Sequence, residues 1–145
     1  MLSIGDLPVP VPLADEVLVR LKYSALNHLD VWVRQGIVGL KLTFPHVLGA
    51  DGAGIVEKTG EQVTRFKAGD EVIVYPGLSC MSCTHCLSAW ESLCSDYKIL
   101  GEQVFGTNAE YVKVPAANIF HKPFGMSFQE AESIGLVFTT AWQML

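Results

Sequence analysis

The chain has 145 residues, 50% of them hydrophobic, and its 10 Lys and Arg against 15 Asp and Glu give a formal net charge of −5. Such a chain can bury a core without disulfides, and its acidic balance argues against nucleic acid or an anionic membrane as a partner. No apolar run approaches the roughly 20 residues of a transmembrane helix, and residues 1–13 lack the basic start of a signal peptide. We therefore expect one modest domain in the cytoplasm.

The first third of the chain predicts an extended entry, a strand and a short helix. Residues 2–12 contain Pro8, Pro10 and Pro12, which prevent a helix. Residues 16–23 alternate as in a half-buried strand, with one face formed by Val17, Val19, Leu21 and Tyr23. Residues 27–34 have the pattern of a short amphipathic helix that Gly36 ends. Residues 41–47, which contain Pro45, are predicted as a loop.

Short strands dominate the middle of the chain. They are predicted at residues 53–57, 71–75 and 110–114, separated by turn signals at Gly60 and at Gly69-Asp70. The glycine-rich residues 49–54 are not in Gly-x-Gly-x-x-Gly order and precede no helical pattern, so we interpret them as allowing close backbone approach rather than binding a phosphate. Many short strands joined by turns indicate a mainly β fold, either a barrel or a sandwich.

The last 19 residues change to a helical period. Ser127 and Glu130 form a capping box. Apolar residues then recur at helical spacing: Phe128, Ala131, Ile134, Phe138, Ala141, Trp142 and Leu145. One helix over residues 127–145 is predicted.

All four cysteines fall in residues 76–98, as Cys80, Cys83, Cys86 and Cys94. The spacing C-x2-C-x2-C-x7-C suits a closed structural zinc site with four thiolates. Disulfides are disfavoured, since cysteines three apart bridge only with strain and no cysteine lies elsewhere. A redox C-x-x-C is the sharper alternative, but it leaves Cys86 and Cys94 without a role. His85 is a possible substitute ligand.

The order of these motifs resembles one family. It runs from Gly49-Ala50-Asp51-Gly52-Ala53-Gly54 through Gly69-Asp70 and the cysteine lobe to residues 106–115. It is similar to the N-terminal, GroES-like domain of the medium-chain dehydrogenase/reductases, which include zinc alcohol dehydrogenases and quinone oxidoreductases. The resemblance implies a partly open GroES-like β-barrel at residues 1–126, with a zinc lobe at 76–98. It further implies that residues 127–145 are a helix leading to a Rossmann NAD(P)-binding domain, so we expect a fragment of a longer enzyme.

The resemblance also indicates which branch of the family is involved. Where zinc alcohol dehydrogenases carry three catalytic zinc ligands, this chain has Asn27, Ala50 and Leu136. These side chains cannot assemble the three-ligand site of a catalytic zinc, and the carboxylates of Asp30 and Asp51 lack nitrogen or sulfur partners. We therefore expect structural zinc without catalytic zinc. Asn27-x-x-Asp30 resembles the quinone-reductase branch, which transfers hydride from NADPH or NADH to an activated carbonyl or alkene.

Three residues are the candidates for that chemistry. Asn27 is the candidate hydrogen-bond donor to a developing negative charge on oxygen, and Asp30 is either a second catalytic residue or the group that orients the helix. Thr140 matches a position close to the nicotinamide. The structural alternatives are a helix cap or core hydrogen bond for Asn27 and a hydroxyl bonded to its own helix for Thr140. Trp32, Phe44 and Trp142 either line a substrate cleft or belong to the core.

The expected partners are a small carbonyl, quinone or alcohol substrate and further copies of the chain, as a dimer or tetramer. We expect the fragment alone to be inactive, because dinucleotide recognition belongs to the Rossmann domain, and to self-associate through the apolar face of residues 127–145. Two other classes stay open. One is a non-enzymatic, zinc-stabilised binding module, and the other is a co-chaperonin, which would need a mobile loop and ring assembly.

Overall fold

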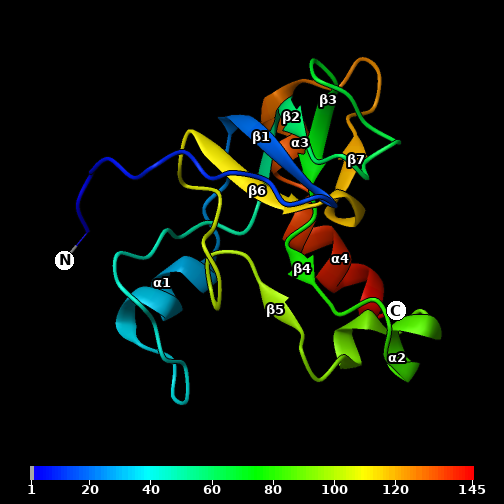
Figure 1. Cartoon of the computed structure of the whole chain (residues 1–145). Coiled ribbons are helices and arrows are strands. Elements are labelled where there is room, and N and C mark those ends of the chain that lie inside the picture. Colours follow the sequence, from blue (N-terminus) through cyan, green and yellow to red (C-terminus); the bar gives the residue numbers. More distant parts are fainter. Residues whose placement is uncertain (1) are drawn as a thin grey trace.

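A computed structural model describes residues 2–145 as a curved antiparallel sheet with helices on one side and a cysteine-rich lobe at one end (Figure 1). The five-stranded sheet has the order β6-β1-β2-β3-β7. Its strands are β1 (Glu16–Tyr23), β2 (Gly52–Thr59), β3 (Glu71–Val74), β6 (Tyr111–Pro115) and β7 (Ile119–His121). Between residues 2 and 145, β6 and β7 remain at opposite edges, so the fold is mainly β with an open sheet, and closure into a barrel is not seen.

The predicted strands are confirmed, with small shifts at their ends. β1 has the predicted bounds, but Leu18 is buried as well as Val17 and Val19, while Tyr23 is largely exposed. The glycine-rich segment enters β2, where a side chain at Gly54 would collide with the backbone carbonyl of Arg20 on β1. Close backbone approach therefore explains this glycine.

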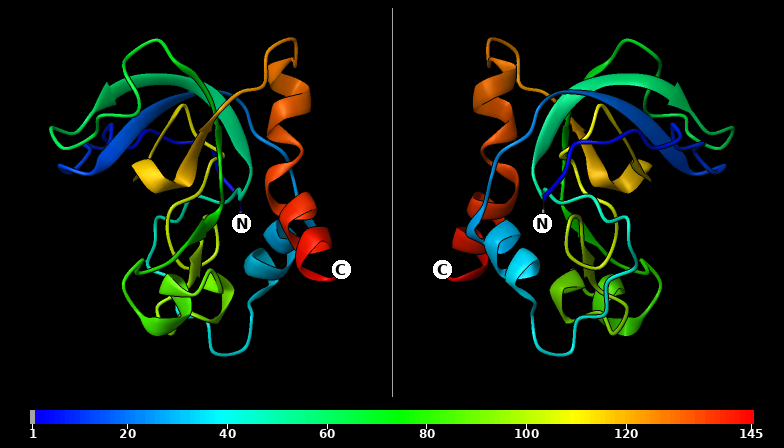
Figure 2. Two further views of the ribbon diagram at one scale, coloured as in Figure 1. Left: turned by 90° about the vertical axis from the view of Figure 1, so that its right-hand side faces the viewer. Right: turned by 90° about the vertical axis from the view of Figure 1, so that its left-hand side faces the viewer.

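The main core lies between the strands and the loops that cross them. It consists of ten buried apolar side chains, Val17, Val19, Val56, Phe66, Val72, Val74, Leu100, Val112, Val114 and Ile119. Because most come from alternating positions of paired strands, the sheet is pinned in register by burial of one face. The curvature of the sheet around this core is visible from the side (Figure 2).

The cysteine-rich lobe is built from very short elements that the sequence pattern did not reveal. It contains β4 (Gly77–Leu78), α2 (Thr84–Leu87), the 3₁₀ turn η1 (Glu91–Leu93) and β5 (Lys98–Ile99). β4 and β5 pair with each other as a separate two-stranded sheet. A further 3₁₀ turn, η2 (Ala116–Asn118), joins β6 to β7. Elements this short carry too few residues for a hydrophobic period to show.

The single C-terminal helix expected over residues 127–145 is two helices, α3 (Phe128–Glu132) and α4 (Gly135–Gln143). Ser127 and Glu130 form the predicted capping box at the start of α3. Ala131 is fully buried against Ala53 and Ile73 of the sheet. The chain turns at Ser133 and Ile134, and none of the residues of α4 is buried.

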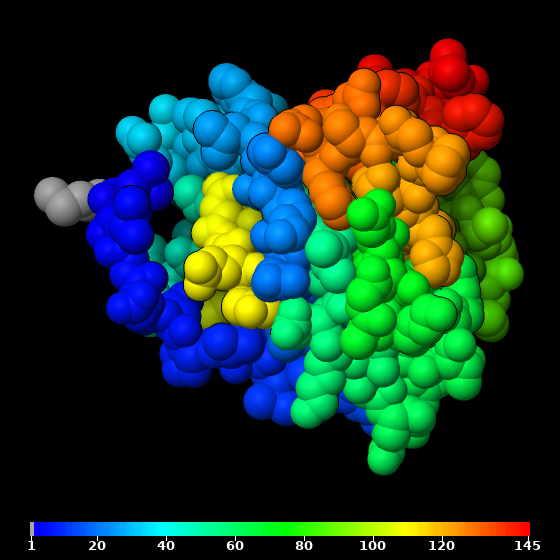
Figure 3. Space-filling view, turned by 90° about the horizontal axis from the view of Figure 1, so that it is seen from above, coloured from blue at the N-terminus to red at the C-terminus, as the bar shows by residue number. Residues whose placement is uncertain are grey.

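Helices α1 (His28–Gln35) and α4 lie on the same side of the sheet (Figure 2). Seen from above, α3 sits between the segment that leads into α1 and the β2–β3 region (Figure 3). Gln129 of α3 donates to the hydroxyl of Tyr23 at 2.8 Å, which joins α3 to the end of β1. No helix in residues 2–145 has both the length and the apolar character needed to cross a membrane.

Candidate functional site

The four cysteines converge at the tip of the lobe. Their sulfur atoms all lie within 4.8 Å of one another, including 3.5 Å between Cys83 and Cys86 and 3.8 Å between Cys80 and Cys86. These separations are far longer than a disulfide, and all four cysteines are free. A zinc bound tetrahedrally by four sulfurs at about 2.3 Å places those sulfurs about 3.8 Å apart. The cluster therefore has the size that zinc requires.

The chemistry of the cluster also fits a cation. The backbone amide of Cys83 lies 3.3 Å from the sulfur of Cys80, and the hydroxyl of Ser82 donates to the same sulfur. Hydrogen bonds from the backbone and side chain of Ser82, followed by the amide of Cys83, lower the pKa of Cys80 to about 6. A lowered pKa favours the thiolate, which is the form that binds metals.

Two hydrogen bonds to Asp30 fix the start of α1, one from within the helix start and one from the segment that enters β2. Asn27 caps the helix, and its backbone amide donates to Oδ2 of Asp30 at 2.8 Å. The other oxygen of Asp30 accepts from the backbone amide of Gly49, also at 2.8 Å. Asp30 is buried, with 8% of its surface exposed, so both of its carboxylate oxygens are used to hold backbone in place.

Asp51 lies at the centre of the arrangement and is almost completely buried, at 1% exposure. Its Oδ2 accepts from the side-chain nitrogen of Asn27 at 2.9 Å, and its Oδ1 accepts from the backbone amide of Leu136 at 2.6 Å. Burial raises the pKa of Asp51, the hydrogen bonds from Asn27 and Leu136 oppose that rise, and the charge of Asp30 adds to it. Asp51 thus joins the start of α1 to the start of α4.

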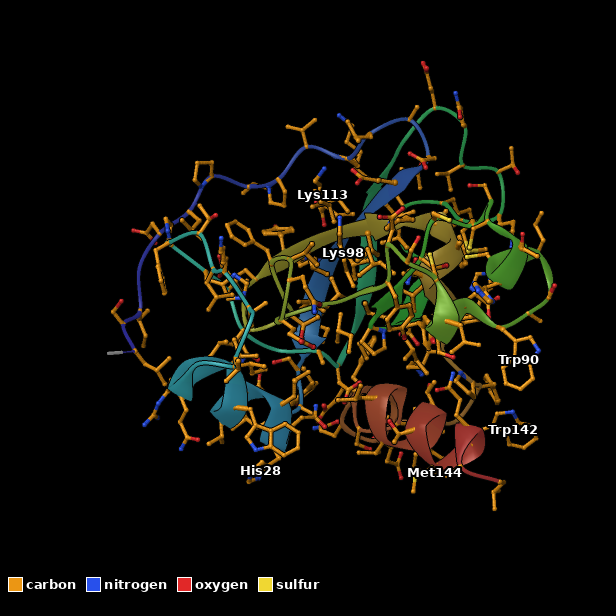
Figure 4. The ribbon with its side chains drawn as sticks, turned by 90° about the horizontal axis from the view of Figure 1, so that it is seen from below. His28, Trp90, Lys98, Lys113, Trp142 and Met144 are labelled. Carbon is orange, nitrogen blue, oxygen red and sulfur yellow. The ribbon has the colours of Figure 1, made fainter. Side chains whose placement is uncertain are left out.

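A groove of about 380 Å³ runs between α1 and α4. It is within the size range of small-molecule sites and is lined by Asn27, His28, Leu29, Trp32, Leu136, Val137, Thr140, Ala141 and Met144. Figure 4 shows His28 on α1 and Met144 directly after the last residue of α4, and these two helices form the walls of the groove. The groove brings together the predicted residues Asn27 and Thr140, and Trp32 lines it, whereas Phe44 and Trp142 do not.

The hydroxyl of Thr140 donates to the carbonyl of Leu136 at 2.8 Å, which is the bond to its own helix that the sequence allowed. Its oxygen can still accept a hydrogen bond from a ligand. The ring of His28 packs edge-on against Trp32, with 4.8 Å between the ring centroids. Asn27, His28 and the indole N–H of Trp32 are therefore the groove-lining groups that could donate to a ligand.

Sequence reasoning missed Glu132 of α3. Its Oε2 is buried and has no hydrogen-bond partner among residues 2–145. Burial raises the pKa of Glu132, and the neighbouring charge of Asp51 raises it further. A signal was present, because Glu132 lies one helical turn after Phe128, on the face that packs against the sheet.

The residues at the expected catalytic zinc position do not fit that metal. Ala50 is buried and offers no ligand atom, Leu136 offers only a backbone amide, and that amide donates to Asp51. Both oxygens of Asp51 accept hydrogen bonds from the chain itself. A zinc site with an open position needs three protein ligands of nitrogen, sulfur or carboxylate oxygen, and this set lacks them.

Comparisons with known proteins agree on one family. Residues 13–124 match the alcohol dehydrogenase GroES-like domain. An alcohol dehydrogenase from Moraxella sp. (strain TAE123) is 37% identical over 112 residues, which are 77% of this chain and 33% of that protein. The chain thus spans about a third of the length of this curated relative.

Two solved structures are closely similar. The crystal structure of an NAD-dependent alcohol dehydrogenase superposes with a TM-score of 0.94 at 57% identity, over 97% of this chain and 41% of that one. A cobalt- and zinc-bound thermostable alcohol dehydrogenase from Pyrobaculum aerophilum gives 0.90 at 36% identity, over 99% and 43%. With the fold, the cysteine cluster and these matches together, the chain belongs to the medium-chain zinc alcohol dehydrogenase family, as its GroES-like N-terminal domain.

Proposed function

We propose that this chain is the substrate-side domain of an NAD(P)-dependent oxidoreductase that interconverts a small carbonyl compound, quinone or activated alkene with its reduced form. The observation that carries the proposal is the groove between α1 and α4, which places Asn27 and Thr140 beside an apolar surface. The proposed division is a GroES-like domain at residues 1–126 and a connecting segment at 127–145, which the structure divides into α3 and α4.

The chain's own residues would bind and orient the substrate. NADPH or NADH, when bound, supplies or accepts the hydride. The apolar side chains of Leu29, Trp32 and Val137 exclude water from the groove and pack against the substrate body. The amide of Asn27 is the proposed donor to the substrate oxygen, a role that matters more where no metal stabilises the charge that develops there.

The other two candidate residues have supporting roles in this proposal. Asp30 orients Asn27, because its carboxylate holds the backbone amide of that residue at 2.8 Å. Thr140 offers its hydroxyl oxygen to the nicotinamide end of the cofactor. We propose no catalytic metal, since both oxygens of Asp51 already accept hydrogen bonds and the side chains of Ala50 and Leu136 carry no ligand atom.

Cys80, Cys83, Cys86 and Cys94 are the proposed ligands of one structural zinc per chain. The cluster's dimensions and the thiolate-favouring hydrogen bonds on Cys80 support this role. Bound metal would fix the loop between β4 and β5, which has little other regular structure to hold it. We propose a dimer or tetramer as the assembled enzyme.

The proposal is tested by the coding sequence beyond Leu145, followed by an assay of the encoded protein. We expect a strand and a Gly-x-Gly-x-x-Gly turn, the dinucleotide fingerprint. Nicotinamide absorbance then reports turnover with quinones, aldehydes and alcohols, and Asn27→Ala should lower kcat/KM with a quinone or aldehyde. Cofactor binding without turnover of quinones, aldehydes or alcohols would contradict the proposed reaction. A protein that binds neither NADPH nor NADH would favour a non-enzymatic zinc module.

A further inference from the structure

Asp51 forms a continuous chain of hydrogen bonds between the two walls of the groove. On one side its Oδ2 holds the side-chain nitrogen of Asn27 at 2.9 Å. On the other side its Oδ1 holds the amide of Leu136 at 2.6 Å, and the carbonyl of Leu136 accepts from Thr140 at 2.8 Å. Asn27, Leu136 and Thr140 all line the groove, so one buried carboxylate is connected to each wall.

A carboxylate fixes the direction in which an asparagine amide points. An amide has a donor end and an acceptor end, and it can turn over to suit its neighbours. An ionised carboxylate only accepts, so it selects the orientation with Nδ2 toward Asp51. The remaining N–H of Asn27 is then left in a defined arrangement for a ligand.

The surroundings of Asp51 allow this pairing to be rigid. Asp30 holds the backbone of Asn27 while Asp51 holds its side chain, so two carboxylates fix one residue. Hydrogen bonds to a charged partner are worth roughly twice those between neutral groups. The side chains of Ala50 and Leu136 carry no metal-ligating atom, and the amide of Leu136 donates to Asp51. Asp51 can therefore serve as the hydrogen-bond acceptor of Asn27.

We infer that Asp51 is the positioning residue of this metal-free site, aligning the amide of Asn27 on one wall with the start of α4 and Thr140 on the other. The inference rests on the proposed function for its catalytic meaning, but the alignment itself is a property of this chain alone. A catalytic zinc would bind and orient the substrate oxygen directly. Here the buried carboxylate of Asp51 orients the side-chain amide of Asn27 instead.

The alignment is tested by hydrogen exchange of the Asn27 side-chain amide, followed by nuclear magnetic resonance on the 145-residue chain. In the wild type these protons should be protected. Asp51→Asn should speed their exchange by about tenfold or more, the factor that matches loss of a hydrogen bond to a charged group. Glu132→Gln is the matched control, because it removes a carboxylate beside Asp51 without touching the amide, and it should leave the exchange unchanged.

A reversed pair separates positioning from general stability. In Asn27→Asp with Asp51→Asn, the carboxylate and amide exchange places, and the protected side-chain amide should move to position 51. An unprotected Asn27 amide in the folded wild type overturns the inference whether or not the variants fold. So does unchanged exchange in a folded Asp51→Asn variant.

Steady-state kinetics of the longer enzyme that the proposed function expects provide a separate measurement. If Asp51 aligns Asn27, Asp51→Asn should lower kcat more than it raises KM, because orientation matters most in the transition state. Turnover that survives Asp51→Asn unchanged would contradict the catalytic meaning even if the amide is protected. An enzyme inactive on every substrate would instead refute the proposed function and leave the exchange result standing.

Discussion

The side-chain nitrogen of Asn27 lies 2.9 Å from Oδ2 of Asp51, although 24 residues separate them in the chain. Asn27 stands where the family resemblance puts one catalytic zinc ligand, and Asp51 directly follows Ala50, which stands at the position of another. It is a neutral donor facing a buried, acceptor-only carboxylate, and each satisfies the other without an ion. The residues of this site therefore favour hydrogen bonding over metal binding.

The cysteine cluster should hold one zinc per chain, the stoichiometry of a single four-cysteine site. Elemental analysis of protein purified without added metal checks this number. Cys94→Ser should lower the zinc content and loosen residues 76–98, because metal binding and local folding are linked. Ser88→Ala, at the end of α2 in the same lobe, is the control. An ordered, metal-free lobe would contradict the prediction, as would a second equivalent of zinc that survives dialysis.

Gly135→Ala should destabilise the chain although alanine is the better helix former. A methyl group at Gly135 would collide with Oδ1 of Asp51, the oxygen that accepts from the amide of Leu136. We expect a loss of about 1–3 kcal/mol in the free energy of unfolding, typical of overpacking. Chemical denaturation measures it, with the exposed Gln143→Ala as a control expected to stay within about 0.5 kcal/mol. Equal stability of wild type and Gly135→Ala would show that Asp51 can shift freely.

Glu132→Gln should stabilise the chain at neutral pH. The pKa of Glu132 is raised by burial and by Asp51, so its charged form is disfavoured in the folded chain. The cost of that charge is absent below the ordinary value of about 4.5 and fully present above the raised pKa. Unfolding measured against pH should thus show a difference between variant and wild type that grows as pH rises through this window.

Glu61→Gln, in an exposed turn, removes the same charge and is the control for the Glu132 measurement. A difference between Glu132→Gln and wild type that stays constant from acid to neutral pH would exclude a titrating Glu132 as its source. A variant that is less stable at neutral pH would show that the buried oxygen is satisfied in solution.

The 145-residue chain by itself should not bind NADPH or NADH at micromolar concentration. Dinucleotide recognition needs a glycine turn and the amides of a helix N-terminus, and the sequence has no Gly-x-Gly-x-x-Gly. Calorimetric titration with both cofactors provides the measurement, with protein whose zinc content has been verified as the reference sample. Micromolar affinity would show that residues of this domain alone hold the cofactor.

The chain should self-associate through the outer face of α4. Phe138 and Trp142 on this helix are 66% and 79% exposed, and apolar surface of this kind tends to bind another chain. Sedimentation should show association that Phe138→Glu weakens. Phe124→Glu, which changes an equally apolar but separate residue at the surface, is the control. A wild-type monomer at high concentration would refute this prediction.

The sequence alone determined the features that depend on neighbours along the chain. The alternation in residues 16–23 predicts β1 with the observed bounds, because one face of that strand is buried by apolar side chains. The capping box at Ser127 and Glu130 starts α3 as predicted, since both partners lie within one turn. The spacing of the four cysteines likewise predicts their convergence, because short loops leave few other arrangements.

Only the tertiary structure decided what depends on residues far apart. Residues 127–145 have one continuous helical period, yet the chain breaks at Ser133 and Ile134, and the amide of Leu136 bonds to Asp51, 85 residues earlier. No local pattern marks Asp51 as the residue between the two walls of the groove. Its role arises because sheet pairing and the packing of α3 bring α1 and α4 together, and long-range contacts of this kind leave no period in the sequence.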